Sequence, residues 1–272
     1  MKVGMADGFR LRVEERGRGP ATLLVHGFTG SVEAWGEAIL DGLVKAGRRV
    51  VAVDLPGHGR SDLPAGPERT TMERLLDDLS AVLDALDLDR ADWIGYSMGG
   101  RIALGAAALR PERVGRLVLE GASPGLETEK ERRARRERDE ALARRILDRG
   151  IEPFVDEWLA LPLFRSRERL SEETRRAERE RRLRCDPRGL AATLRGVGTG
   201  RQPSFWADLA QVDVPTLLLA GADDPKYRAL AERMAALLPR AEVGVVAKAG
   251  HTTHLEAPDE WLRRVTEFLA ER

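Results

Sequence analysis

The chain has 272 residues, of which 42% are hydrophobic and 33% are charged, so it is long enough for one large domain with an inserted segment and a sizeable core. Lys+Arg and Asp+Glu number 45 each, and this balance removes the basic field that nucleic-acid binding usually requires. Cys185 is the only cysteine, which excludes an intramolecular disulfide and a thiolate metal cluster.

The first 18 residues alternate charged and apolar side chains. They lack the apolar core of a secretory signal, and no stretch of the chain approaches the roughly 20 apolar residues that span a bilayer. We therefore expect a soluble, cytoplasmic protein that binds no membrane. Within this segment Phe9, Leu11 and Val13 alternate with polar residues, which predicts an edge strand.

Short apolar runs then alternate with helical patterns. The runs are typical of fully buried parallel strands and cover residues 21–26, 49–54, 91–95, 114–120, 214–221 and 242–247. Between them, leucines and other apolar residues recur every three or four positions, most clearly in 75–86, 230–238 and 261–269. This alternation predicts an α/β fold with a mostly parallel sheet and helices on both faces.

The alternation stops at about residue 123 and resumes at about 213. The stretch between has no good strand pattern, and residues 127–149 are nearly all Glu, Arg and Ala. We predict a core domain formed by residues 1–122 and 210–272, with residues 123–209 inserted as a helical cap. Most charges of the Arg/Glu run are expected to lie on a solvated helix face joined by i,i+4 ion pairs.

One turn carries the strongest chemical signal. The sequence Gly95-Tyr96-Ser97-Met98-Gly99-Gly100 follows an apolar strand and opens a helix. A G-x-S-x-G turn is too tight for side chains at its two glycine positions, and it lifts the serine hydroxyl above the sheet edge. We therefore predict an α/β-hydrolase fold in which Ser97 is the reactive group.

A serine hydroxyl needs a base. His251 follows an apolar strand and a turn, where this fold presents its base, and His254 is the alternative. We interpret the other two histidines, His26 and His58, as structural because each lies in a tight turn at a strand end. No histidine–carboxylate set with metal spacing is left over, so neither a metal nor a cofactor is expected.

The base in turn needs an acid that fixes its tautomer. Asp224 lies just past the strand of residues 214–221, and the order Ser, Asp, His along the chain is that of this fold. Asp223 is adjacent and could substitute, and Glu120, at the end of another strand, is a weaker alternative.

Two backbone N–H groups could hold an oxyanion. Met98 opens the helix after Ser97, and its N–H points toward negative charge that develops nearby. Phe28 follows the strand of residues 21–26, and its N–H could complete the oxyanion hole.

Arg101 is unusual because it lies one helical turn after Ser97, on the same face and in the first turn of the helix. The helix dipole disfavours a cation there. A bound anion would offset this cost; a lone salt bridge is the alternative.

Several strings resemble one family, the 2-succinyl-6-hydroxy-2,4-cyclohexadiene-1-carboxylate synthases of menaquinone biosynthesis. They span about residues 21–258, cap included: GYSMGGRIAL (95–104), HGFTGS (26–31), DLPGHGRSD (54–62), LEGASPGL (119–126), PLF (162–164), GLA…LRG.GTG.QPS.W (189–206) and D.KY (224–227). HG and DLPGHG are common to many α/β-hydrolases, whereas the cap strings and the position of Arg101 are much more specific.

The resemblance implies a lyase that removes pyruvate from 2-succinyl-5-enolpyruvyl-6-hydroxy-3-cyclohexene-1-carboxylate. Ser97, assisted by His251 and Asp224, would abstract a ring proton alpha to the succinyl carbonyl. Phe28 and Met98 would hold the enolate oxygen. The chemistry is proton transfer, so no acyl-enzyme is required.

The resemblance also implies residues that bind this small, three-carboxylate substrate. By position in the matching strings, they are Tyr96, Arg101, Arg135, Trp158, Arg182 and Lys226. Arg179, Arg181 and Arg184 lie close enough in the sequence to take the place of Arg182.

Two other functions remain open at this stage. The same triad could serve an ordinary serine hydrolase of a small anionic ester or thioester. A non-catalytic scaffold is the third possibility, although an intact Ser/Asp/His set argues against it. Both a monomer and a homodimer are compatible with the sequence.

Overall fold

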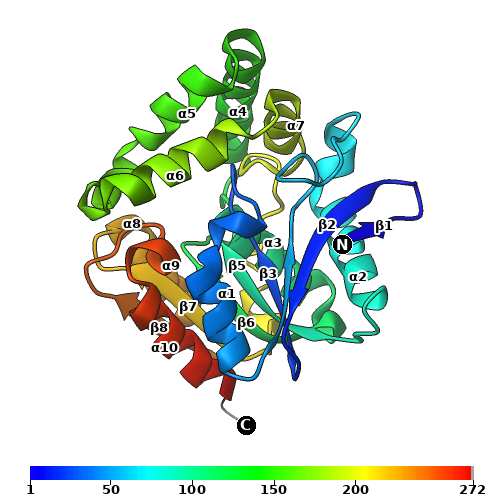
Figure 1. Ribbon diagram of the computed structural model, residues 1–272, viewed down its shortest axis with the longest axis vertical. Helices are drawn as coiled ribbons and strands as arrows, with labels where there is room; N and C mark the ends of the chain where they lie inside the picture. The colour runs from blue at the N-terminus through cyan, green and yellow to red at the C-terminus, as the bar shows by residue number, and fades with distance from the viewer. Residues whose placement is uncertain (271–272) are drawn as a thin grey trace.

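The computed structural model describes residues 1–270, which form a central sheet with helices on both faces and further helices above one of its edges (Figure 1). Eight strands lie in the order β1-β2-β4-β3-β5-β6-β7-β8. The strands from β3 to β8 are parallel, whereas β1 and β2 run antiparallel to their neighbours. The predicted fold class is therefore confirmed. The strands are β1 (Lys2–Gly4), β2 (Arg10–Arg16), β3 (Ala21–Val25), β4 (Arg49–Val53), β5 (Ala91–Tyr96), β6 (Val114–Glu120), β7 (Thr216–Gly221) and β8 (Ala241–Val246).

The prediction of an edge strand near the N-terminus was wrong in one respect. The strand exists as β2, but it pairs with β4 on one side and with β1 on the other, so it is second from the edge. Its Leu11 and Val13 are fully buried. The edge strand β1 has only three residues, too few for an alternating pattern to stand out in the sequence.

The two faces of the sheet bury separate cores because successive side chains of a strand point to opposite sides. On β5, Trp93 belongs to the core beneath α2, α3 and α8, and Ile94 belongs to the core beneath α1 and α10. The helices of this domain are α1 (Gly36–Lys45), α2 (Met72–Asp84), α3 (Met98–Leu109), α8 (Pro225–Ala235), α9 (Thr253–Glu256) and α10 (Pro258–Ala270). Within residues 1–270, no helix is both long and apolar enough to cross a bilayer.

Between β6 and β7 the described chain is helical or irregular, and its helices lie above the sheet (Figure 1). A small core of their own, which includes Ala143, Phe154 and Leu190, holds them together. The elements are α4 (Glu129–Arg149), α5 (Ile151–Leu159), the 3₁₀ segment η4 (Pro162–Arg169), α6 (Glu172–Leu183) and α7 (Pro187–Val197). We refer to residues 123–209 as the cap; this division of the chain stays a prediction.

Candidate active site

The turn between β5 and α3 has the strained geometry that the glycine pattern predicts. Ser97 adopts φ 52° and ψ −106°, a backbone conformation rare for residues other than glycine. A Cβ on Gly99 would lie 1.9 Å from the Val25 carbonyl oxygen, and one on Gly95 would lie 2.4 Å from the Gly99 carbonyl oxygen. Glycine is therefore required at both positions, and the turn can approach β3 closely enough to present Ser97 at the sheet edge.

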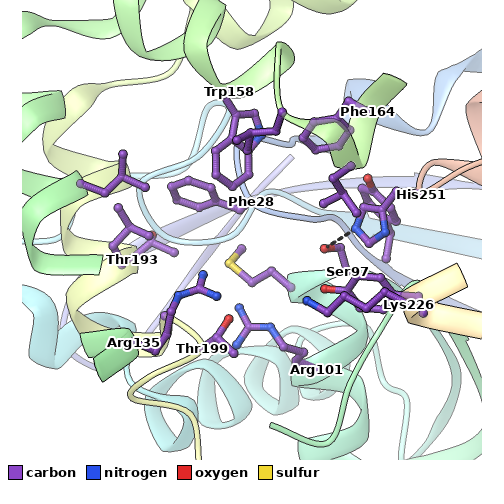
Figure 2. A pocket seen from close by; sticks show the side chains of 18 of the residues that line it. Phe28, Ser97, Arg101, Arg135, Trp158, Phe164, Thr193, Thr199, Lys226 and His251 are labelled. Atoms are coloured by element: carbon purple, nitrogen blue, oxygen red, sulfur yellow. Dashed lines mark hydrogen bonds between the residues drawn. The ribbon is translucent and has the colours of Figure 1, made fainter. Parts of the chain in front are cut away.

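Three side chains from three loops form a hydrogen-bonded chain at this edge. His251 Nε2 lies 3.1 Å from Ser97 Oγ (Figure 2). On the other side of the ring, His251 Nδ1 lies 2.8 Å from Asp224 Oδ2. Asp224 and His251 are both buried. Since the carboxylate can only accept at Nδ1, it fixes the tautomer in which Nε2 is free to take the serine proton.

The alternatives for the base and the acid have other partners. His254 Nδ1 lies 2.9 Å from Glu120 Oε2, and that carboxylate also accepts from Thr253 Oγ1 at 2.7 Å and Trp261 Nε1 at 3.0 Å. Burial alone would raise the pKa of Glu120, but His254 and these hydrogen bonds hold the pKa below its ordinary value. Asp223 is exposed and pairs with an arginine of η4. Within residues 1–270, His254 makes no hydrogen bond to Ser97, and neither Asp223 nor Glu120 makes one to His251.

Glu120→Gln should lower the free energy of unfolding by about 1.5–3 kcal/mol, because a buried carboxylate that accepts several hydrogen bonds is lost. We expect kcat to stay close to that of the wild type in the folded fraction. Urea denaturation measures the first effect, and Glu242→Gln, an exposed change on β8, is the control. If stability stayed at the wild-type level while activity disappeared, Glu120 would belong to the catalytic set.

The remaining two histidines occupy structural positions. His26 Nδ1 donates to the Gly27 carbonyl at 2.8 Å, and its Nε2 accepts from the Leu55 N–H at 3.0 Å. Burial lowers the pKa of His26 to about 4 and that of His58 to about 3. Both imidazoles are therefore neutral near pH 7 and brace the loops after β3 and β4.

The two predicted oxyanion donors lie at the same edge. Met98 is the first residue of α3, and Phe28 follows β3 in the loop that the glycine turn approaches. Within residues 1–270, neither N–H donates to a protein acceptor. Both are thus available to a ligand beside Ser97.

A cavity of about 250 Å³ opens above Ser97, between the sheet edge and the cap. It brings together all six residues that the resemblance implies for binding, with Trp158, Phe28 and Phe164 along one wall and Arg101 and Arg135 at the opposite end (Figure 2). The lining comprises Phe28, Tyr96, Ser97, Met98, Arg101, Arg135, Leu142, Trp158, Leu161, Leu163, Phe164, Arg182, Thr193, Leu194, Gly198, Thr199, Lys226, Tyr227 and His251. A site of this shape suits a small molecule with an apolar body and anionic groups.

Arg101 is the most unusual group in the cavity. Its Nη1 donates to the Val197 carbonyl at 3.0 Å and to Gln202 Oε1, both of which are neutral acceptors. Among the described residues no carboxylate lies within 4.0 Å of its guanidinium, so the salt-bridge alternative does not hold. Burial lowers the pKa of Arg101 to about 10, which leaves it charged at pH 7.

Of the four neighbouring arginines of α6 and its C-terminus, Arg182 is the one that lines the cavity. It is buried and bonds to Glu178, which also pairs with Arg181 and Arg167. Burial alone would raise the pKa of Glu178, but these three guanidinium groups hold it well below its usual range. The other two pair with carboxylates at the surface: Arg179, which is half-buried, and Arg184, which is exposed.

The other predicted binding residues differ in the protein groups that their side chains already contact. Arg135 faces the cavity but also pairs with Asp139, its Nε lying 2.7 Å from Oδ1. Lys226 is exposed, and its Nζ lies 5.2 Å from the ring centroid of Tyr227. The Tyr96 hydroxyl lies 2.9 Å from Thr252 Oγ1.

Reasoning from residue types missed several residues of the site, and three of them lie close to its polar groups. The Tyr227 ring packs against the His251 ring at a tilt, with centroids 4.5 Å apart. Thr199 lies at the end of the cavity that holds Arg101 (Figure 2). Gln202, outside the cavity lining, accepts a hydrogen bond from Arg101 through its Oε1. All three fall inside strings on which the family resemblance rests, and that was the only signal in the sequence that could have found them.

Comparison with known proteins places the chain in a family. Residues 20–258 match the model of the alpha/beta hydrolase fold family, and the chain belongs to that family. A Bacillus subtilis (strain 168) protein, provisionally named 2-succinyl-6-hydroxy-2,4-cyclohexadiene-1-carboxylate synthase, is 42% identical over 271 residues, which are 99% of this chain and 98% of the relative. A Klebsiella pneumoniae synthase of the same name is 30% identical and covers 92% of this chain and 94% of its own. The chain thus belongs to the 2-succinyl-6-hydroxy-2,4-cyclohexadiene-1-carboxylate synthase family, which confirms the resemblance.

Solved structures of similar proteins share the fold of this chain. The structure of MenH from S. aureus superposes with a TM-score of 0.89 at 33% identity, covering 95% of this chain and 97% of that one. A thermophilic esterase from Thermogutta terrifontis, solved with malate bound, superposes with a TM-score of 0.86 at 28% identity, covering 99% and 97%.

Proposed function

We propose that the chain is the lyase that eliminates pyruvate from 2-succinyl-5-enolpyruvyl-6-hydroxy-3-cyclohexene-1-carboxylate to give 2-succinyl-6-hydroxy-2,4-cyclohexadiene-1-carboxylate in menaquinone biosynthesis. The family membership supports this reaction. The substrate is a small polycarboxylate, and a biosynthetic enzyme of this kind is expected to work in the cytoplasm.

The proposed mechanism begins with proton transfer. His251 Nε2 takes the Ser97 hydroxyl proton while Oγ removes the ring proton alpha to the succinyl carbonyl, and Asp224 stabilises the imidazolium that results. The electron pair of the broken C–H bond moves onto the carbonyl oxygen. The Phe28 and Met98 N–H groups donate to that enolate.

Elimination completes the reaction. The enolate collapses to form a C=C bond between ring carbons 2 and 3, the existing C=C bond shifts from carbons 3 and 4 to carbons 4 and 5, and the C–O bond to the enolpyruvyl group breaks. The leaving group takes the proton that His251 holds and tautomerises to pyruvate. The serine hydroxyl, the neutral imidazole and all atoms of the substrate are thereby accounted for.

Family membership favours a lyase, and one observation carries the choice of an anionic substrate: within residues 1–270, Arg101 is a buried cation without a carboxylate partner, one helical turn from Ser97. A desolvated cation at a helix N-terminus is unfavourable unless an anion binds there. The carboxylates of the substrate provide such an anion, and Arg135 and Arg182 line the same cavity.

A serine hydrolase of a small anionic ester is the second candidate. The hydrogen-bonded triad and the likeness to the Thermogutta terrifontis esterase favour it. The two functions differ in what Ser97 does, since a hydrolase uses it as a nucleophile toward a carbonyl carbon.

A paired assay separates the two functions. One preparation receives the enolpyruvyl substrate, generated in situ by the upstream enzymes, and in parallel a series of p-nitrophenyl esters. We expect stoichiometric pyruvate and slow ester turnover. Fast ester hydrolysis without pyruvate would assign the chain to the hydrolases.

A further inference from the structure

We propose that Gln202 is a positioning residue whose neutral amide holds Arg101 in place while leaving its positive charge to the substrate. This inference rests on the proposed function, because it concerns the same anion-binding end of the cavity. It assigns a role to a residue that does not line the cavity.

Two acceptors hold one nitrogen of the Arg101 guanidinium, Nη1, in place. Gln202 is 1% exposed, and its own N–H donates to the Gly198 carbonyl at 3.0 Å, which anchors the loop after α7. Its Oε1 and the Val197 carbonyl both accept from Arg101 Nη1. Within residues 1–270, Arg101 Nε and Nη2 have no protein partner, so they remain available to a ligand in the cavity.

A comparison with the other buried arginines shows what is special about this arrangement. Six arginines in the described chain are at most 9% exposed. Five of them pair with a carboxylate: Arg48 with Asp92, Arg69 with Asp78, and Arg167, Arg181 and Arg182 with Glu178. Arg101 alone has an amide and a carbonyl instead. Pairing with a carboxylate, the usual arrangement of a buried arginine in this protein, is thus absent at Arg101 alone among these six.

The amide carries a cost of its own. Gln202 Nε2 is buried and has no hydrogen-bond partner among the described residues; a Cβ on Gly125 would lie 3.2 Å from it. A buried donor without a partner is unfavourable. A glutamate of the same shape would have no such donor and would form an ion pair with Arg101, but it would also neutralise the charge that the substrate needs.

The substitution Gln202→Glu therefore tests the proposal with almost no change in shape. We expect KM for the enolpyruvyl substrate to rise at least about tenfold, because an internal carboxylate competes with that of the substrate, and kcat to change less. Gln202→Leu, which removes the acceptor without adding charge, should raise KM less than Gln202→Glu. Gln211→Glu places the same new charge on an exposed position of the chain and should behave as the wild type.

A binding measurement keeps this test independent of the reaction. Succinate at millimolar concentration should raise the Tm of the wild type and of Gln211→Glu, and should leave that of Gln202→Glu unchanged. Absence of pyruvate release by the wild type would defeat the proposed function alone. Equal KM values and equal succinate shifts in Gln202→Glu and the wild type, or no succinate shift in the wild type, would overturn the role of Gln202.

Discussion

Replacing Ser97 by alanine is expected to lower kcat for pyruvate release by about 10²- to 10⁴-fold, the usual contribution of a positioned acid–base group. In the proposed mechanism the hydroxyl removes the ring proton; His251 Nε2 lies 3.1 Å from Ser97 Oγ, and Asp224 Oδ2 lies 2.8 Å from His251 Nδ1. Pyruvate formation coupled to NADH oxidation measures the loss.

A matched serine variant separates this effect from a general loss of structure. Ser80 lies on α2, away from the cavity, and Ser80→Ala should retain wild-type kcat. Because Ser97 sits at φ 52°, alanine there can also relax the turn, so Tm should be recorded for both variants. Residual turnover of Ser97→Ala within tenfold of the wild type would mean that another group removes the proton.

Arg101→Ala is expected to lower kcat/KM for the enolpyruvyl substrate by about 30- to 1,000-fold, which corresponds to about 2–4 kcal/mol of lost transition-state stabilisation. The effect is large because a charge-assisted bond in a buried site is lost and a substrate carboxylate is left without its partner. Steady-state kinetics on both variants of this position, alanine and lysine, measure it.

Two further variants, Arg101→Lys and Arg110→Ala, serve as references for Arg101→Ala. Arg101→Lys keeps the charge but cannot reproduce the planar fork of donors, so it should recover only part of the activity. Arg110, at the C-terminus of the same helix, is half-buried, lies outside the cavity and pairs with Asp77 at the surface, so it should tolerate alanine. Wild-type kcat/KM in Arg101→Ala would exclude an anion site at this end of the cavity.

The sheet and the serine turn could be predicted from the sequence because both depend on local patterns. Buried parallel strands are continuous apolar runs, and the G-x-S-x-G string marks the strand-turn-helix around Ser97, whose glycines at 95 and 99 leave room for the turn and for β3. The three-residue strand β1 carries no such pattern, and the position of β2 in the sheet was therefore mispredicted.

Hydrogen-bond partners could not be predicted in the same way. His251 lies in the loop before α9 and His254 lies three residues later within α9, and only the tertiary structure pairs His254 with Glu120 and His251 with Asp224. The same holds for the cap, where nearly every position around Arg182 is charged and each guanidinium has several carboxylates within reach. The proposed role of Gln202 could not be predicted, because an uncharged amide has no distinctive sequence pattern. It becomes apparent only from its hydrogen bond with Arg101 in the folded chain.

The central claim is that Ser97 acts as a base toward carbon, although its triad has the geometry of a serine hydrolase. Intact-mass spectrometry of the enzyme, acid-quenched during steady-state turnover of the enolpyruvyl substrate, tests this most directly. We predict that the chain keeps its unmodified mass while pyruvate accumulates. An acyl adduct on Ser97 that forms and decays with turnover would contradict the account and show that the serine reacts as a nucleophile.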